Sequence, residues 1–207
     1  MSSSSVAVLG KGSLAIKIAN WFEESPDWNP VHVCPVLPEP DWTASLRDWA
    51  ATQPGVKACT FDQLDDYDLV FSCYYDRILD GKFIERHGRV LNLHNGPLPR
   101  YRGVNPINWA LKNDEREHGV TIHEIEEGVD TGPIVSQVRF SIWPEIDEVR
   151  DVYERCLVFG WHLFTQTMPR LQQIEADPQN DAEASYYDRS MGSMLDERAG
   201  WTRAEEA

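Results

Sequence analysis

Apolar residues in the first half of the chain fall into two kinds of stretch. Short, β-branched runs typical of buried strands occupy residues 6–9, 31–36, 56–60, 68–75 and 89–94. Between them lie amphipathic stretches typical of helices, at residues 14–24, 45–51 and 81–86. Ser13 is predicted to cap the first helix, and Pro35 fits the last residues of a strand. Strands that alternate with helices predict a parallel, doubly wound α/β sheet.

The second half follows a different pattern. Two strand-like runs, residues 119–125 and 133–142, are separated only by a short turn, which predicts an antiparallel pair. Residues 145–175 form a long amphipathic stretch, predicted as a helix that breaks at Pro169. We therefore expect one domain over residues 1–176 and an acidic tail over 177–207. The tail either packs on the domain through Tyr186, Tyr187 and Trp201 or is partly disordered.

Charge and cysteine usage narrow the functional class. The 207 residues carry a formal net charge of −15, which disfavours a broad nucleic-acid or anionic-membrane face because such faces rely on Lys and Arg. The four cysteines are widely spaced and suit neither a zinc site nor a disulfide framework, and Cys34, Cys59 and Cys73 are expected to pack as small apolar residues. Residues 1–10 have no basic region and no long apolar stretch, so no signal peptide is expected, and no apolar run approaches the roughly 18 residues of a membrane span. We expect a cytoplasmic protein.

Polar side chains follow the last strand of the predicted parallel sheet. Asn92 and His94 leave the same face of that strand, near its carboxyl end, where open α/β sheets bind ligands. Asp130 lies in a turn flanked by Gly128 and Gly132. Asn and imidazolium can donate to a developing oxyanion, and a carboxylate raises the pKa of a nearby His. This trio suits acyl transfer to an amine without a metal or a covalent nucleophile, although each residue is also ordinary as a hydrogen-bonded structural group.

The surrounding motifs resemble a known family. The segments NLHNGPLPRYRG (92–103) and HGVTIHEIEEGVDTGPIVSQ (118–137) are similar, in order and spacing, to the catalytic core of the N10-formyltetrahydrofolate-dependent formyltransferases. That family includes glycinamide ribonucleotide, methionyl-tRNA and sugar-nucleotide N-formyltransferases. The resemblance implies a Rossmann-like mixed sheet with a terminal antiparallel strand pair and a long C-terminal helix.

The resemblance also implies roles for individual residues. Asn92 and His94 would polarise the formyl oxygen, and Asp130 would keep His94 charged and help to move protons through water. The folate would be held by two loops and by the turn before Asp130, through Tyr75, Asp76, Arg77, Ile78, Leu79, Pro97, Leu98, Glu126, Glu127, Gly128 and Val129. His123 matches a histidine near that pocket, and a core histidine is an equal alternative. Arg100 and Arg102 are candidates for the folate tail or an anionic acceptor.

The acceptor is predicted from positions where this sequence differs from particular members of the family. The loop GKGSLA (10–15) lacks the Asn of the phosphate loop in glycinamide ribonucleotide enzymes, yet Lys11, Gly12 and Ser13 offer an anion site at a helix start. The acidic tail differs from the basic domain of methionyl-tRNA enzymes. The segment ASYYDRS (184–190) is similar to the region after the core in sugar and peptide-assembly formyltransferases. We expect an amino-sugar nucleotide, with glycinamide ribonucleotide and siderophore or peptide amines as alternatives.

Parts of the sequence also fit other classes of function. GKGSLA fits the dinucleotide fingerprint G-x-G-x-x-A, but an acidic residue at the end of the second strand is missing, since Glu39 and Asp41 come later. An NAD(P)-dependent oxidoreductase would also leave the motifs at residues 92–137 unexplained. A non-catalytic folate-binding protein and a formyltetrahydrofolate hydrolase are the remaining alternatives. No nucleic acid or membrane partner is expected, and a homodimer is one option for the oligomeric state.

Overall fold

Five parallel strands form the sheet of the N-terminal unit, in the order β3-β2-β1-β4-β5. The computed structural model describes residues 3–195, and the chain divides into two units, residues 1–93 and 94–207. The strands are β1 (Ser4–Gly10), β2 (Trp28–Pro35), β3 (Val56–Ala58), β4 (Leu69–Cys73) and β5 (Arg89–His94). The helices are α1 (Gly12–Glu24), α2 (Leu46–Ala51) and α3 (Gly81–Glu85), with a 3₁₀ turn at Phe61–Gln63.

Burial explains why the central strands read as continuous apolar runs. Every residue of β4, and β1 from Val6 onward, is buried, as expected for parallel strands covered on both faces. The amphipathic face of α1 supplies part of that cover through Leu14, Ile18 and Phe22. The carboxyl ends of β1 and β4 come very close, since a Cβ on Gly10 would lie 1.9 Å from the carbonyl oxygen of Cys73.

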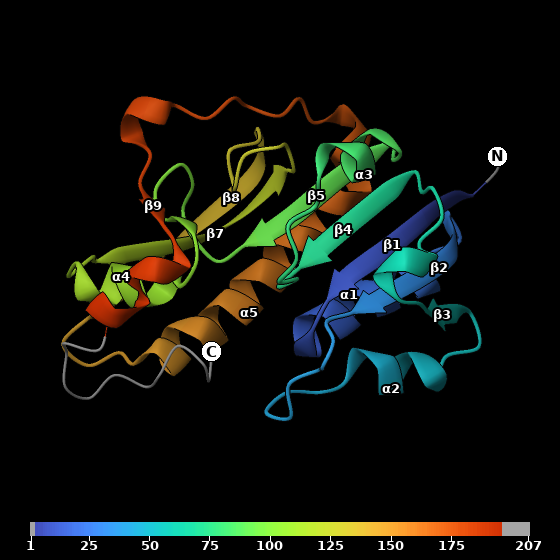
Figure 1. The fold of residues 1–207 in the computed structure, drawn as a ribbon, viewed down its shortest axis with the longest axis horizontal. Coiled ribbons are helices and arrows are strands. Elements are labelled where there is room, and N and C mark those ends of the chain that lie inside the picture. Colours follow the sequence, from blue (N-terminus) through green and yellow to red (C-terminus); the bar gives the residue numbers. More distant parts are fainter. Residues whose placement is uncertain (1–2, 196–207) are drawn as a thin grey trace. The chain divides into compact units, whose positions relative to one another are not determined.

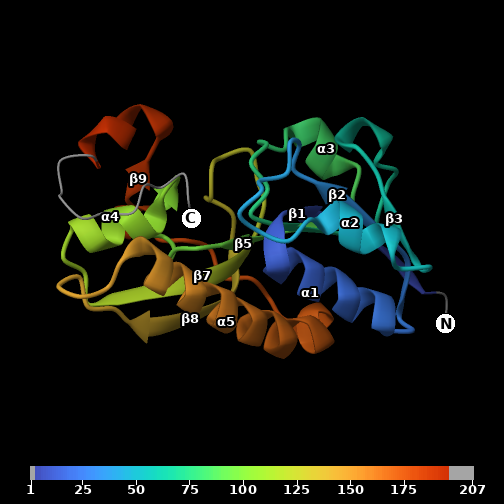
Figure 2. The same ribbon diagram turned by 90° about the horizontal axis from the view of Figure 1, so that it is seen from below.

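The C-terminal unit is built on an antiparallel pair. β7 (Glu117–Glu124) pairs with β8 (Ile134–Ser141), and α5 (Val149–Thr167) packs along both strands (Figure 2). The short strand β6 (Arg102–Gly103) pairs with β9 (Tyr186–Tyr187) in a separate small sheet. The remaining elements are α4 (Pro106–Lys112) and the 3₁₀ helices η2 (Met168–Gln173), η3 (Asp181–Glu183) and η4 (Arg189–Met194).

The predicted α/β class, the parallel strands, the antiparallel pair and the long C-terminal helix are confirmed. The long helix is shorter than predicted, because α5 ends at Thr167 and the chain continues as a 3₁₀ helix through Pro169. The predicted cap was wrong: Lys11 is the N-cap of α1 and makes no side-chain capping bond. The helix α4 was missed. All four cysteines are buried and unpaired.

Within residues 177–195, the acidic tail contains η3, β9 and η4. Figure 1 shows the orange-to-red segment after α5 passing the ends of β7 and β8 and reaching β9 beside α4. Asp177 forms an antiparallel bridge with Ile134, and Tyr187 stacks on Trp109 at 4.4 Å between ring centroids. Trp201 lies outside the described residues. No helix in the described part of the chain is long and apolar enough to cross a membrane.

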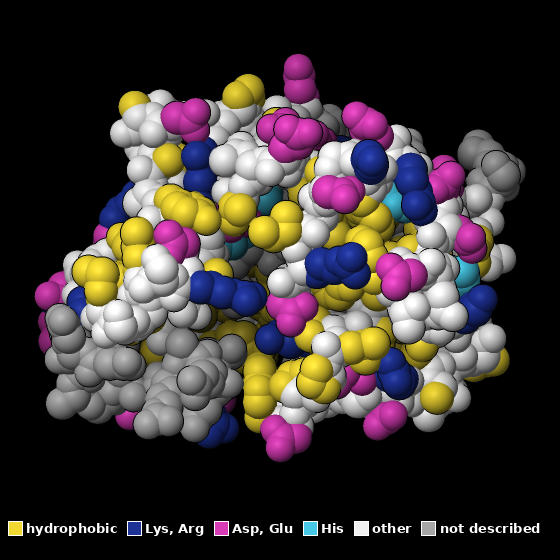
Figure 3. Space-filling model, viewed as in Figure 1, with side chains coloured by type: hydrophobic (Ala, Val, Ile, Leu, Met, Phe, Trp, Pro, Cys, Tyr) yellow, Lys and Arg dark blue, Asp and Glu magenta, His cyan; other side chains and the backbone are white. Residues whose placement is uncertain are grey.

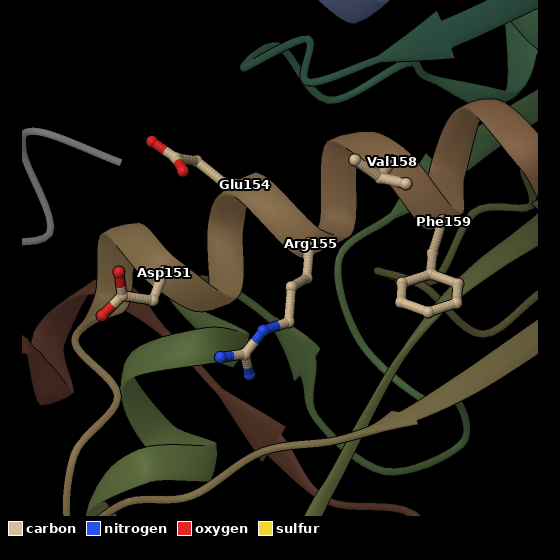
Figure 4. A pocket seen from close by; sticks show the side chains of 5 residues that line it. All are labelled: Asp151, Glu154, Arg155, Val158 and Phe159. Atoms are coloured by element: carbon tan, nitrogen blue, oxygen red, sulfur yellow. The ribbon is translucent and has the colours of Figure 1, made fainter.

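A shallow groove runs along α5 within the C-terminal unit. It has a volume of about 350 Å³ and is lined by Asp151, Glu154, Arg155, Val158 and Phe159 (Figure 4). The groove carries none of the histidines or the turn residues singled out in the sequence, so it is separate from the predicted site.

Candidate functional site

His94, the last residue of β5, is buried and uses both ring nitrogens within the protein. Its Nε2 lies 2.8 Å from the carbonyl oxygen of Tyr101, and its Nδ1 lies 3.5 Å from Oδ2 of Asp130. A carbonyl oxygen can only accept, so Nε2 carries the proton and Nδ1 faces the carboxylate. The loop packs tightly on this ring, because a Cβ on Gly96 would lie 2.7 Å from Nε2. The sequence at 94–101 therefore fixes the tautomer as well as the position of His94.

Asp130 connects two imidazoles. Besides facing His94, its Oδ1 lies 3.4 Å from Nε2 of His123, and its Oδ2 accepts the backbone N–H of Gly103 at 2.8 Å. His123 donates Nδ1–H to the carbonyl of Glu124. Asp130 itself has a left-handed backbone, with φ 54°. The sequence left His123 undecided between pocket and core, and the structure brings it to Asp130.

Burial and charge act in opposite directions on this pair. Burial lowers the pKa of His94 below its ordinary value, and the Asp130 carboxylate opposes that shift without reversing it. Burial raises the pKa of Asp130, but the imidazoles of His94 and His123 and the Gly103 N–H together bring it well below its usual range. The expected raised pKa of His94 was therefore wrong for the free protein, because burial outweighs the carboxylate. At neutral pH the site holds an ionised Asp130 beside a neutral His94.

Asn92 lies two residues before His94 on β5 and is half-buried. Because side chains alternate along a strand, Asn92 and His94 leave the same face. Both residues lie on β5, as predicted, while the shared role of their side chains stays a prediction.

A row of side chains from the antiparallel pair fixes the loop after β5. The carbonyl of Asn95 accepts from Nε2 of His118, and the carbonyl of Gly96 accepts from the Thr121 hydroxyl at 2.7 Å. Gln137 donates to the carbonyl of Leu98 at 2.8 Å and to the Thr121 hydroxyl at 2.9 Å. Burial lowers the pKa of His118 to about 4, so this ring is neutral. The segments HGVTIH (118–123) and SQ (136–137) supply these donors.

The two arginines predicted at this loop are engaged within the protein. The Arg100 guanidinium pairs with Glu115 and lies 5.3 Å from the ring centroid of Tyr101. Arg102 is buried, and its guanidinium donates to Gln179 and Asp181. Pro97 and Leu98 are buried in the loop, and Leu98 is only 1% exposed.

The turn before Asp130 presents an open surface. Glu126, Glu127, Gly128 and Val129 are all exposed, and Val129 keeps 37% of its surface accessible. Gly132 must remain a glycine, since a Cβ there would lie 2.0 Å from the carbonyl oxygen of Glu124. The turn thus offers backbone groups and one apolar side chain to a ligand.

In the N-terminal unit, the segment after β4 also presents an apolar side chain. Ile78 is 75% exposed whereas Leu79 is buried, and Asp76 is exposed. The Arg77 guanidinium lies 3.8 Å from the ring centroid of Phe61, on which Tyr75 also stacks. The Tyr75 hydroxyl contacts Cys34 Sγ at 3.5 Å. The predicted folate residues therefore include one exposed apolar side chain beside a cation held on an aromatic ring.

The glycine-rich loop before α1 has limited room. A Cβ on Gly12 would lie 2.9 Å from the Thr43 hydroxyl, and Gly12 has φ 79°. Lys11 lies 5.7 Å from the ring centroid of Trp42, and Ser13 is exposed.

Side-chain charge is mixed at the surface. On the face shown in Figure 3, Lys and Arg lie in small separate groups with acidic side chains between them. Among the described residues, no three His, Cys, Asp or Glu side chains come together in a way that could hold a metal ion.

Known proteins are similar to this chain in sequence and in fold. The sequence profile of the family described as formyl transferase matches residues 5–168. WlaRD, a sugar 3N-formyl transferase solved with dTDP and 5-N-formyl-THF, is 26% identical, with a TM-score of 0.82 over 92% of this chain and 71% of that chain.

Two further structures are similar. The N-formyltransferase of Helicobacter canadensis, solved with folinic acid and dTDP-3-aminofucose, is 29% identical, with a TM-score of 0.77 over 89% of this chain and 71% of that chain. The formyltransferase PseJ of Anoxybacillus kamchatkensis, solved with a UDP-linked formamido sugar and tetrahydrofolate, is 26% identical, with a TM-score of 0.68 over 98% and 96% of the two chains. Because the family profile covers most of the sequence, including Asn92, His94 and Asp130, this chain belongs to the formyl transferase family.

Proposed function

We propose that this protein transfers the formyl group of N10-formyltetrahydrofolate to the primary amine of an amino-sugar nucleotide. The observation that carries the proposal is the His94–Asp130 pair at the end of β5, two residues after Asn92, in a chain of the formyl transferase family. The acceptor class is supported by WlaRD, a sugar 3N-formyl transferase, and by the Helicobacter canadensis N-formyltransferase, which was solved with dTDP-3-aminofucose.

The donor is assigned to residues that suit a flat, partly apolar ligand with an anionic tail. Tyr75, Asp76, Arg77, Ile78 and Leu79 form one group, and Pro97, Leu98, Glu126, Glu127, Gly128 and Val129 form the other. Ile78 and Val129 fit this assignment because they are apolar side chains left accessible in otherwise polar loops. The bound donor supplies the activated formyl group, and the protein binds and orients it.

The acceptor is assigned to the start of α1 and to the loop after β5. Lys11, Gly12 and Ser13 offer a cation and helix N–H groups to a phosphate. Arg100 is exposed enough to contact the acceptor, although it shares its charge with Glu115.

The chemistry requires one new bond and one broken bond. The acceptor nitrogen forms a C–N bond to the formyl carbon, the formyl oxygen gains charge, and the bond to N10 then breaks. Asn92 and the Nε2–H of His94 donate to that oxygen, and His94 shares its proton between the oxygen and the Tyr101 carbonyl.

Proton transfer is assigned to the other side of the ring. His94 starts neutral, so Nδ1 can take up the proton that the amine loses, delivered through water. Asp130 stabilises the resulting imidazolium, and the same proton then neutralises the departing N10 nitrogen.

The proposal is tested by incubating the protein with N10-formyltetrahydrofolate and a panel of amines. The panel contains dTDP- and UDP-linked amino sugars, glycinamide ribonucleotide and hydroxyornithine, and mass spectrometry detects the addition of one formyl group. We expect formylation of an amino-sugar nucleotide, with His94→Ala as the matched inactive control. Formylation of glycinamide ribonucleotide alone would contradict the acceptor class.

A binding measurement separates the proposal from the dinucleotide alternative. Calorimetry is expected to detect 5-formyltetrahydrofolate and not NAD(H) or NADP(H). Binding of a nicotinamide dinucleotide without binding of the folate would contradict the proposed donor.

A further inference from the structure

The catalytic groups of the C-terminal unit stand on two strained backbone positions. Asp130 has φ 54°, and Tyr101, whose carbonyl accepts the His94 proton, has φ 62°. Such angles are uncommon for residues other than glycine, more so for Tyr than for Asp, and the surrounding contacts help to hold them. The contacts that hold them therefore help to decide where the carboxylate and the imidazole lie.

Those contacts come from residues 177–187, here called the C-terminal strap, which lie after the region that the family profile matches. At the Tyr101 end, the Ser185 hydroxyl accepts the Tyr101 N–H at 2.8 Å, and the Ser185 carbonyl accepts the Arg102 N–H at 2.9 Å. Tyr187 then stacks on the Tyr101 ring, with centroids 5.6 Å apart and planes at 11°.

At the Asp130 end, the strap acts through one side chain. Gln179 donates its Nε2 to the carbonyl oxygens of Asp130 at 2.8 Å and Gly132 at 2.7 Å. A single amide thus contacts the residue with the left-handed backbone and the end of the turn after it.

The same side chain also reaches back to the loop after β5. Oε1 of Gln179 accepts from Nε and Nη2 of Arg102, at 3.0 and 2.8 Å. Arg102 is adjacent to Tyr101 and to Gly103, whose N–H donates to the Asp130 carboxylate. Gln179 therefore joins Asp130, through its donors, to Arg102, the residue after Tyr101, through its acceptor.

We propose that Gln179, together with Arg102, is a positioning residue that sets the distance between Asp130 and His94. This assigns Arg102 to positioning, in place of the substrate contact expected from its place in the sequence. The inference rests on the proposed function, because it concerns the geometry of the same pair. It also predicts that the catalytic unit requires the chain beyond α5.

Two substitutions distinguish the effect of the Gln179 donor group from the effect of its acceptor group. Gln179→Leu removes both sets of bonds at similar volume. Gln179→Glu keeps an acceptor for Arg102 but replaces the donors to the Asp130 and Gly132 carbonyls with a carboxylate oxygen. The matched control is Gln172→Leu, the same change at an exposed glutamine of η2.

The first readout is kinetic. A displacement of about 1 Å at a catalytic group costs up to roughly 10²-fold in rate. We expect both Gln179 variants to lower kcat by about tenfold or more while KM for either substrate changes little. Unfolding temperature should remain near that of wild type in Gln179→Glu, which retains the Arg102 contact, and Gln172→Leu should match wild type throughout.

The second readout does not depend on turnover. Nitrogen-15 NMR of the histidine rings, assigned with His94→Gln, reports whether the Nε2 proton of His94 is retained in its hydrogen bond to Tyr101. We expect that proton to be protected from exchange in wild type and Gln172→Leu and exposed in both Gln179 variants. Absence of formyl transfer by wild type would refute the proposed function, and the NMR result would still decide the positioning role.

Near-wild-type kcat in Gln179→Glu, or an unchanged His94 signal in that variant, overturns the proposal. A loss of kcat that follows the unfolded fraction and disappears on cooling also overturns it, since Gln179 would then only stabilise the fold.

Discussion

The His94 imidazole presents its unprotonated Nδ1 to the Asp130 carboxylate, 3.5 Å away, because the Tyr101 carbonyl holds the proton on Nε2. In the free protein this leaves a neutral ring beside an anion, in a buried site. Such a pair can accept a proton at Nδ1, and the carboxylate stabilises the charge that forms. In the proposed mechanism, the pair therefore changes charge during the reaction rather than before it.

Asp130→Asn is expected to remove that stabilisation while the fold survives. The amide oxygen can still accept the Gly103 N–H, so the turn keeps one of its bonds. Without the carboxylate, the His94 imidazolium loses its stabilising partner. Weakening one group that stabilises the transition state costs on the order of 10² to 10³ in rate. Single-turnover formyl transfer measures the effect, and a near-wild-type rate in the folded variant would refute the role of Asp130.

The effects of His94 and Asp130 should be less than additive. Both groups act on one proton and one oxyanion, so removing the second after the first costs little more. We expect His94→Ala with Asp130→Asn to be about as slow as His94→Ala alone. If the two rate losses multiply, the residues act independently and the shared-proton mechanism is wrong.

Methionyl-tRNA should be a poor partner. Tight tRNA binding needs clustered Lys and Arg, whereas this chain has 19 basic against 34 acidic residues, and on the face in Figure 3 the basic side chains lie in separate groups. A filter-binding assay across a salt series is expected to show only weak binding. Tight binding that falls steeply with salt would contradict this prediction.

The elements that depend on local apolar patterning were predicted well from the sequence. β5 has the predicted bounds, and β7 and β8 pair as expected, because buried β-branched runs mark parallel and antiparallel strands alike. The helix α4 was missed because it begins with a left-handed Asn105 and Pro106 inside a stretch that resembles a loop.

The site could be predicted only for residues that belong to a recognisable sequence motif. Asn92, His94 and Asp130 could be named from a motif, but the pKa of His94 depends on burial, which is a tertiary property. Gln179 lies in a polar segment without periodicity, and its partners are 77 and 49 residues away. Hydrogen bonds over such separations leave no pattern in a single sequence.

His118 should make the protein less stable in mild acid. Its folded pKa, lowered by burial to about 4 from 6.5, means that the unfolded chain binds more protons between those values. Stability from this group is therefore complete above pH 6.5 and falls by about 2 kcal/mol at pH 5. We expect His118→Gln, measured by urea unfolding, to lose much of this pH dependence, and the exposed control His162→Gln to keep it. Equal slopes in all three proteins would refute the assignment.

Gly103→Ala should separate the C-terminal strap from the site. Gly103 has φ 91°, and a Cβ there would lie 2.0 Å from the carbonyl oxygen of Tyr187, so the β6–β9 pairing cannot survive unchanged. An alanine at a positive φ with such a clash is expected to cost about 2 kcal/mol or more. The Gly103 N–H to Asp130 should also weaken, which lowers kcat. Gly192→Ala is the matched control, because no atom lies within 4 Å of its Cβ position.

Hydrogen exchange should show faster exchange at the Val104 N–H, which donates to Tyr187, in Gly103→Ala alone. Unchanged exchange and activity in that variant would show that the strap does not hold the site.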